Sequence, residues 1–133
     1  MDRERVQGWL DRYVEAWRTY DATLIGELFT EDAEYRYRPA DEPVRGREAI
    51  VASWLTPQGP ASGRDEPGTF EGRYEPFAVE GDRAVAVGRT DYWTDAEHAR
   101  LDKTYDNAWL LEFDPAGRCR RFTEFFMKRR TSA

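Results

Sequence analysis

The predominant spacing of apolar residues differs between the two halves of this chain of 133 residues, and the difference limits the folds open to it. Up to about residue 55, apart from the short stretch 33–38, apolar side chains recur every three or four positions, which is typical of helices that bury one face. After about residue 68 they alternate with period two, which is typical of half-buried strands. Helices gathered ahead of strands favour an α+β domain in which a strongly curved sheet packs on the helices.

Three helices are predicted in the first part of the chain. The first spans residues 2–20, and Asp2 can cap its N-terminus. Asp21 is placed to cap a short second helix that continues to about Phe29. The stretch "GREAIVASWL", residues 46–55, predicts the third helix.

Strands fill most of the remaining chain. The stretch "AEYRYR", residues 33–38, alternates strictly and predicts a half-buried strand with Tyr35 and Tyr37 on one face. Residues 56–68, "TPQGPASGRDEPG", hold three prolines and three glycines, which predicts a mobile loop. An antiparallel run of four strands follows, over residues 69–79, 84–95, 103–113 and 119–129. We expect one domain over residues 1–133, because this length needs only one core.

Charged residues share a face with apolar ones on two of these strands. In strand 84–95 we take Val85 and Val87 as inward, which also turns Arg89 and Asp91 inward. Glu124 has inward parity on the last strand. Buried carboxylates without a partner are costly, so these acids should either pair with Arg89 or have raised pKa values. Both outcomes suit acid–base catalysis, although an ion pair that only supports the sheet is an equal alternative.

Aromatic residues are too many for one small core. They make up 14% of the chain, whereas the whole apolar fraction is 40%. Large rings with polar tips suit the wall of a pocket as well as a core. Any single ring can belong to the core, and an inward amide can serve sheet backbone groups instead of a ligand. The candidate substrate-binding residues are Tyr13, Trp17, Tyr37, Trp54, Trp93, Tyr105, Asn107, Trp109 and Phe126.

The stretch "LFTEDAEYRYRPADEPVRGREAI" resembles the signature of the nuclear transport factor 2-like superfamily, which includes the SnoaL-like and ketosteroid isomerase-like cone folds. The predicted order of elements fits that superfamily over nearly the whole chain. The resemblance implies a conical domain of three N-terminal helices on a curved mixed or antiparallel sheet. It also implies a deep pocket between the sheet and the helices, and commonly a homodimer.

One branch of the superfamily adds a more specific expectation. Arg-x-Asp at 89–91, Tyr35 and a carboxylate on the last strand resemble the limonene epoxide hydrolases. That resemblance implies that Glu124 activates a water, Asp91 protonates the substrate, Arg89 couples the two and Tyr35 positions the water. Glu124 stands where that branch has Asp, and Tyr37 stands where it has Asn. The ketosteroid isomerase comparison allows proton transfer without any water.

Several kinds of chemistry find no support in the sequence. The net charge of −6 and the mixing of both signs along the chain argue against nucleic-acid binding. Cys119 is the single cysteine and His98 the single histidine, and His98 lies in a charged turn that should be exposed. We therefore expect no disulfide framework, no metal and no cofactor.

Two expectations concern location and assembly. The N-terminal stretch never becomes a long apolar run, which argues against a signal peptide or membrane span and favours the cytoplasm. Leu110, Phe125 and Met127 have outward parity, so the convex sheet face should be exposed and apolar. Such a face predicts a homodimer interface.

The leading interpretation is a cofactor-independent acid–base enzyme that acts on a small apolar or aromatic molecule. Isomerisation, cyclisation, dehydration and hydrolysis all fit, with Asp91, Arg89, Glu124 and Tyr35 as the catalytic candidates. Two alternatives stay open: a non-catalytic binder of a hydrophobic small ligand, and a structural dimerisation domain. The sequence names neither the substrate nor the reaction.

Overall fold

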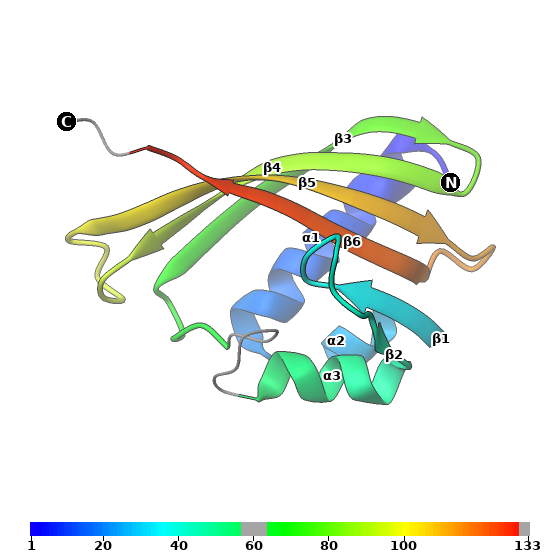
Figure 1. Cartoon of the computed structure of the whole chain (residues 1–133), viewed down its shortest axis with the longest axis horizontal. Helices are drawn as coiled ribbons and strands as arrows, with labels where there is room; N and C mark the ends of the chain where they lie inside the picture. The colour runs from blue at the N-terminus through cyan, green and yellow to red at the C-terminus, as the bar shows by residue number, and fades with distance from the viewer. Residues whose placement is uncertain (57–63, 131–133) are drawn as a thin grey trace.

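Three helices lie together beneath a long, twisted sheet (Figure 1). The structure is a computed structural model that describes residues 1–56 and 64–130. The helices are α1 (Arg3–Thr19), α2 (Ala22–Glu27) and α3 (Arg47–Leu55). The strands are β1 (Phe29–Arg36), β2 (Val44–Arg45), β3 (Phe70–Glu80), β4 (Arg83–Trp93), β5 (Leu101–Phe113) and β6 (Cys119–Lys128). The predicted α+β class, with three helices on a curved mixed sheet, is confirmed.

The sheet has the order β2-β1-β6-β5-β4-β3. The four long strands form an antiparallel run, as predicted, and β1 joins that run beside β6 in parallel orientation. In the middle of the sheet, Gly88 of β4 lies opposite Asn107 of β5, and Trp109 of β5 lies opposite Glu124 of β6. This register brings side chains from three strands to one place on the inner face.

Side-chain caps begin the first two helices at the predicted residues. Asp2 accepts a hydrogen bond from the backbone N–H of Arg5 at 2.8 Å. Asp21 accepts two, from the first turn of α2, at 2.9 and 3.1 Å. Helix α2 is shorter than predicted, because Phe29 already belongs to β1 and packs its ring edge on Trp9 in the core.

The connection predicted at residues 56–68 is described only in part. Residues 57–63 lie outside the described residues. Residues 64–68 form turns and irregular backbone without helix or strand.

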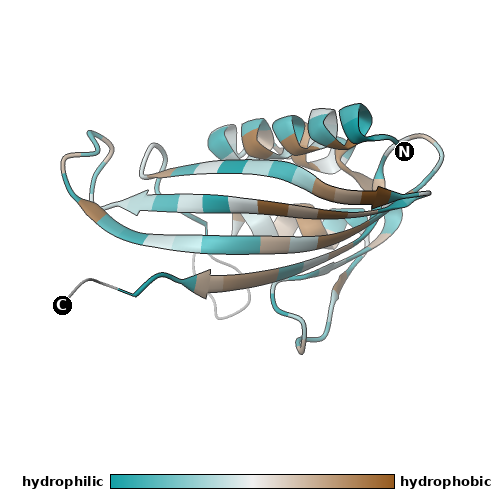
Figure 2. Ribbon diagram, turned by 90° about the horizontal axis from the view of Figure 1, so that it is seen from above, coloured by the Kyte–Doolittle hydropathy of each residue, from teal (hydrophilic) through white to brown (hydrophobic). Residues whose placement is uncertain are grey.

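The hydrophobic core fills one end of the space between sheet and helices. Figure 2 shows apolar residues concentrated in the part of the sheet that holds the start of β4 and the end of β5. Trp9 of α1 is fully buried there, and its indole N–H donates to the carbonyl of Leu28 at 3.0 Å. Its ring meets Phe113 edge-on at 5.4 Å. The other end of the sheet carries more polar side chains, and the cavity described below lies there.

Strand β4 turns the opposite face inward from the one predicted. Ala84, Ala86 and Thr90 are buried, whereas Arg89 is exposed. The reason is the ring of Tyr74, which crosses over Gly88 from the neighbouring strand. A Cβ atom at Gly88 would lie 2.0 Å from Cδ1 of Tyr74, which no real side chain tolerates. Position 88 on the inner face of β4 therefore needs glycine, and ranking the two faces of the strand by bulk gave the wrong answer.

We expect Gly88→Ala to lower the free energy of unfolding by about 1–3 kcal/mol, because the added methyl group must displace the Tyr74 ring. Gly8→Ala on α1 is the matched control, since its Cβ would meet nothing closer than Nη1 of Arg12 at 3.6 Å. The control should gain about 0.5–1 kcal/mol from helix propensity. Urea unfolding measures both. A Gly88→Ala protein as stable as wild type would contradict the close packing.

The outer face of the sheet exposes apolar side chains from β5 and β6, as expected. Leu110, Phe125 and Met127 are 47%, 43% and 75% exposed. Charges of both signs flank them, among them an ion pair of 2.8 Å between Arg129 and Asp106. Two copies related by a twofold axis could pack these apolar side chains against the same side chains of the other copy, with opposite charges paired around them. We propose that a second copy of the chain covers this face.

Light scattering should then give twice the mass of the chain, and Phe125→Glu should shift the protein toward the monomer by placing charge inside the interface. Leu101→Glu, at an exposed apolar side chain at the start of β5, is the control and should leave the mass unchanged. A monomeric wild-type protein would rule out the homodimer.

Candidate functional site

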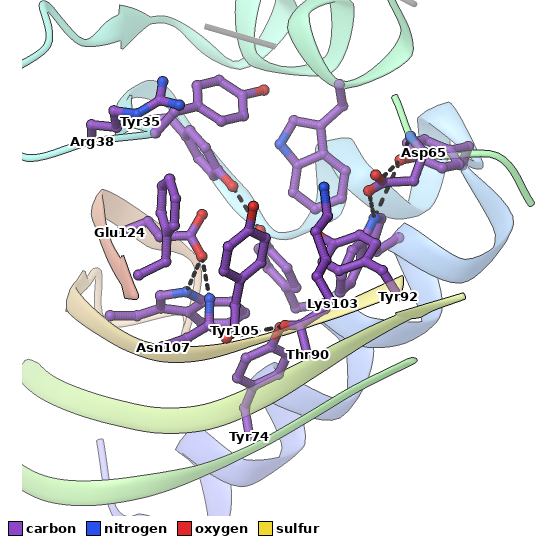
Figure 3. Close-up of a pocket in the computed structure, with 17 residues that line it drawn as sticks. Tyr35, Arg38, Asp65, Tyr74, Thr90, Tyr92, Lys103, Tyr105, Asn107 and Glu124 are labelled. Carbon is purple, nitrogen blue, oxygen red and sulfur yellow. Dashed lines mark hydrogen bonds between the residues drawn. The ribbon is translucent and has the colours of Figure 1, made fainter. Parts of the chain in front are cut away.

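A cavity of about 340 Å³ lies between the inner face of the sheet and the helices (Figure 3). All seven tyrosines of the chain line it: Tyr13, Tyr20, Tyr35, Tyr37, Tyr74, Tyr92 and Tyr105. Four further rings complete the aromatic wall: Trp17, Trp54, Trp109 and Phe126. The other lining residues are polar or charged: Arg38, Asp65, Thr90, Lys103, Asn107 and Glu124. The volume is near the lower end of the range for small-molecule sites.

The closed end of the cavity is formed by two tyrosines whose hydroxyl groups meet. The oxygen atoms of Tyr13 and Tyr35 are 2.6 Å apart, and the two residues are 6% and 2% exposed. The ring of Tyr35 also stacks on Phe122 at 4.3 Å, which fixes its orientation. Burial raises the pKa of both phenols well above the ordinary value of 10.0, so both stay neutral. They can donate hydrogen bonds, but they cannot act as bases.

Glu124 brings a carboxylate into this aromatic wall from β6. Its Oε2 accepts a hydrogen bond of 2.8 Å from Nδ2 of Asn107 and one of 3.0 Å from Nε1 of Trp109 (Figure 3). Its Oε1 accepts none from the described residues. Because both donors occupy Oε2, a proton taken up by this carboxylate belongs on Oε1.

The pKa of Glu124 is raised above the ordinary value of 4.5. The main cause is burial, which disfavours the charged form. The hydrogen bonds from Trp109 and Asn107 and the positive charge of Arg38 act in the opposite direction and offset only part of that effect. A carboxyl group with a raised pKa can both accept and release a proton closer to neutral pH.

A chain of hydrogen bonds leads from β3 to this carboxylate. Tyr74 bonds to Thr90, whose hydroxyl donates to Oδ1 of Asn107 at 3.1 Å. Since Thr90 gives its only hydrogen to Asn107, Tyr74 is the donor in the first bond. Asn107 is therefore held with its amide N–H groups toward Glu124. Its partners are side chains, so its contacts differ from the alternative in which it serves sheet backbone groups.

A second carboxylate enters the cavity wall away from Glu124. Oδ2 of Asp65 accepts a hydrogen bond of 3.1 Å from Nε1 of Trp17 and lies 3.5 Å from the hydroxyl of Tyr20. Burial raises its pKa, while the hydrogen bond from Trp17 and the charge of Lys103 oppose that rise. The cavity is thus lined by two acidic side chains, Asp65 and Glu124, and by two positively charged ones, Arg38 and Lys103.

Most of the predicted site residues line the cavity. They are Tyr13, Trp17, Tyr35, Tyr37, Trp54, Tyr105, Asn107, Trp109, Glu124 and Phe126. Their contact with a ligand stays a prediction. Trp93 lies outside the cavity wall, because it follows the outward parity of β4 and stacks on His98 at 3.8 Å. His98 is exposed, as expected.

The predicted coupling of Arg89 and Asp91 to Glu124 is wrong. Both residues sit on the outer face of β4, where Arg89 and Asp91 form an ion pair of 3.1 Å. Thr104 donates a hydrogen bond of 2.7 Å to Asp91 on the same face. Burial alone would raise the pKa of Asp91, but the bonds from Thr104 and Arg89 outweigh it and lower the pKa. These residues match the alternative of an ion pair that supports the sheet.

Seven lining residues were not predicted: Tyr20, Arg38, Asp65, Tyr74, Thr90, Tyr92 and Lys103. Lys103 could have been found, because it shares inward parity with Tyr105 and Asn107. Thr90 and Tyr92 were missed because the wrong face of β4 was predicted to point inward. Asp65 lies in a segment rich in proline and glycine, where no periodicity marks an inward side chain.

Two further observations concern metals and membranes. Within residues 1–56 and 64–130, no group of three or more His, Cys, Asp and Glu side chains is arranged to hold a metal ion. The helices described here include none with the length and apolar character needed to cross a membrane.

The fold and the cavity together define a class of protein: a cone-shaped α+β domain with an internal aromatic pocket. The family model of the SnoaL-like domain matches residues 10–122, and the chain belongs to this family. A comparison with curated protein sequences finds no match.

Solved structures share the fold at low sequence identity. An NTF-2 like protein of unknown function from Burkholderia xenovorans superposes with a TM-score of 0.66 at 18% identity, over 98% of this chain and 88% of the other. A protein from Sphaerobacter thermophilus gives 0.63 at 19% identity, over 91% and 94%. A protein described as "putative ketosteroid isomerase" from Kribbella flavida gives 0.66 at 16% identity, over 99% and 84%. These likenesses concern the fold.

We expect Glu124→Gln to stabilise the fold at neutral and alkaline pH. The raised pKa means that the folded state keeps its proton where the unfolded state has lost it, so wild-type stability falls as pH rises above about 4.5 and through the folded pKa. Glutamine keeps an oxygen that can accept both hydrogen bonds and does not ionise. Thermal melts should show a gap that widens from pH 4 to pH 8. The acid Asp65 is present in both proteins, so the gap reports Glu124 together with its electrostatic coupling to Asp65. An equal melting temperature at every pH would show that the carboxylate is not desolvated.

Proposed function

We propose that this protein is a cofactor-independent acid–base enzyme, with Glu124 as the group that moves the proton. The observation that carries the proposal is the arrangement of its carboxylate: Oε2 is held by two N–H donors, while Oε1 takes no hydrogen bond from the described residues in a wall of aromatic rings. In its ionised form, Oε1 takes a proton from a carbon of the bound molecule. In its protonated form, the same atom returns a proton to another position, which completes an isomerisation, cyclisation or elimination.

The raised pKa supports this role, because desolvation makes the ionised carboxylate a stronger base than one in water. The donors from Asn107 and Trp109 keep the group from swinging away while its charge changes. The chain from Tyr74 through Thr90 holds Asn107 in turn. Asn107, Thr90 and Tyr74 are therefore positioning residues.

Charge that develops on the bound molecule needs hydrogen-bond donors in the cavity wall. In the pair of Tyr13 and Tyr35 one hydroxyl donates to the other, which leaves the second hydroxyl hydrogen for a ligand oxygen. Trp54 adds an indole N–H, the one buried side-chain polar atom of the described residues without a hydrogen-bond partner. An unpaired buried donor costs about 1–3 kcal/mol, which an acceptor on a ligand would offset. Neutral donors near a developing oxyanion are a common means of stabilising it. This proposed role of Tyr35 differs from the water-positioning role that the resemblance implied.

The alternative of a non-catalytic binder predicts the same cavity and a different chemistry. In a binder, the Glu124 carboxylate would serve only as a hydrogen-bond acceptor, and its replacement would change affinity without removing any reaction. The third alternative, a purely structural domain, expects the space to be filled, and the cavity of about 340 Å³ speaks against it.

The probe reaction is the elimination of 5-nitrobenzisoxazole, an aromatic compound whose proton on C3 of the isoxazole ring is removed by a carboxylate base. The base takes that proton, the C–H electrons form the nitrile, and the N–O bond breaks to give a coloured phenolate. We expect wild-type protein to accelerate this reaction and Glu124→Gln to reduce the rate at least about a hundredfold. The rate should rise with pH through the pKa of Glu124, above 4.5.

Asp91→Asn is the matched control, because it removes a carboxylate that lies on the outer face. Its rate should equal that of wild type. Wild-type protein no faster than acetate at the same concentration would contradict the proposal, as would a Glu124→Gln protein with full activity.

A further inference from the structure

Positive charge lies at the open end of the aromatic cavity. Arg38, which follows β1, is exposed, and Lys103 near the start of β5 is half-buried. Phe126, beside them in the cavity wall, is 39% exposed, whereas Tyr35 and Trp109 at the other end are both 2% exposed. The two cations that line the cavity therefore belong to its mouth.

The ammonium group of Lys103 is held by rings and not by acids. Its Nζ lies 5.1 Å from the ring centroid of Tyr92 and 5.5 Å from that of Tyr105. Figure 3 shows the side chain rising between these two tyrosines, away from the strand. Among the described residues it makes no hydrogen bond and no ion pair, and Asp65 feels its charge without approaching to 4.0 Å. Ring faces attract a cation but leave its three N–H donors available.

Lys103 is also at a defined distance from the proposed chemistry. Inner-face residues of β5 follow one another as Lys103, Tyr105, Asn107 and Trp109, and Asn107 bonds to Glu124. Lys103 and Asn107 are four residues apart, which is about 13 Å along a strand. Tyrosine rings line the space between them. A molecule that reaches from one to the other has to be flat, apolar in its middle and polar at the end beside Lys103.

We propose that Lys103 anchors the carboxylate of an aromatic acid, whose ring system enters the cavity and presents its far edge to Glu124. This inference rests on the proposed function, because it names the substrate class of the same site. The anion meets a cation whose donors are unused, and it stays about 13 Å along β5 from the level of Asn107, which limits repulsion from Glu124. The aromatic wall accepts the rings. The cavity volume suits ligands of one to three rings.

The experiment compares acids with their neutral amides. Benzoate, 2-naphthoate and 2-anthroate, each paired with its primary amide, are titrated by calorimetry into wild-type protein. We expect at least one acid to bind about tenfold or more tightly than its amide, because a charge-assisted hydrogen bond is added. Lys103→Met should reduce that ratio to about one, and Lys103→Arg should keep most of it. Arg73→Met is the control, since Arg73 lies on the outer face with 84% of its side chain exposed, and it should leave the ratio unchanged.

Two results would overturn the inference: no acid in the panel binding better than its amide, or a preference for acids that survives in Lys103→Met. Lys103→Gln is a second neutral variant and replaces Lys103→Met if the Lys103→Met protein has a much lower melting temperature than wild type. The same titrations in Glu124→Gln keep this inference separate from the proposed function. If the ratio of acid to amide affinity in Glu124→Gln protein still depends on Lys103, the anchor is supported even when wild-type protein shows no elimination activity. If Glu124→Gln loses the elimination activity but the ratio of acid to amide affinity is the same with and without Lys103, the proposed role of Glu124 stands and the proposed anchor is wrong.

Discussion

The desolvated carboxylate of Glu124 is the constraint around which the inner face of this sheet is built. An ionised acid in an aromatic wall is unfavourable unless donors face it, and two N–H groups from β5 do so at 2.8 and 3.0 Å. Those donors come from Asn107 and Trp109, which the sheet register places beside it. The donors from Asn107 and Trp109 both bind Oε2, so Oε1 is the oxygen that would exchange a proton with a ligand in the proposed reaction.

The donors are in turn held by packing from the next strands. Trp109 is stacked on by Tyr74 at 4.1 Å, and Tyr74 reaches it across Gly88. The hydroxyl of Tyr74 then begins the hydrogen-bond chain that orients Asn107. One glycine on β4 therefore allows both contacts.

Charge is sorted by face and by depth in this fold. The outer face pairs its charges in exposed ion pairs such as Arg89 with Asp91, which contribute little to stability individually. The inner face holds few charges, and each has a specific partner: amide and indole donors for Glu124, an indole for Asp65, and tyrosine rings for Lys103. A charged group whose partners are neutral keeps its net charge and can still bind an oppositely charged or polar group of a ligand. This is the physical basis of both proposals.

The sequence by itself determined the order of elements, the caps at Asp2 and Asp21, and the inward parity of β5 and β6, including Asn107 and Glu124. These features depend on local periodicity and on backbone groups near in sequence. The face of β4 was decided only in the tertiary structure, because its inner face has glycine at position 88 to admit Tyr74, a ring that belongs to another strand. The place of Asp65 in the cavity wall was likewise decided there. Contacts between distant segments leave no period in the sequence, so they can be located only once the sheet has curved around the helices.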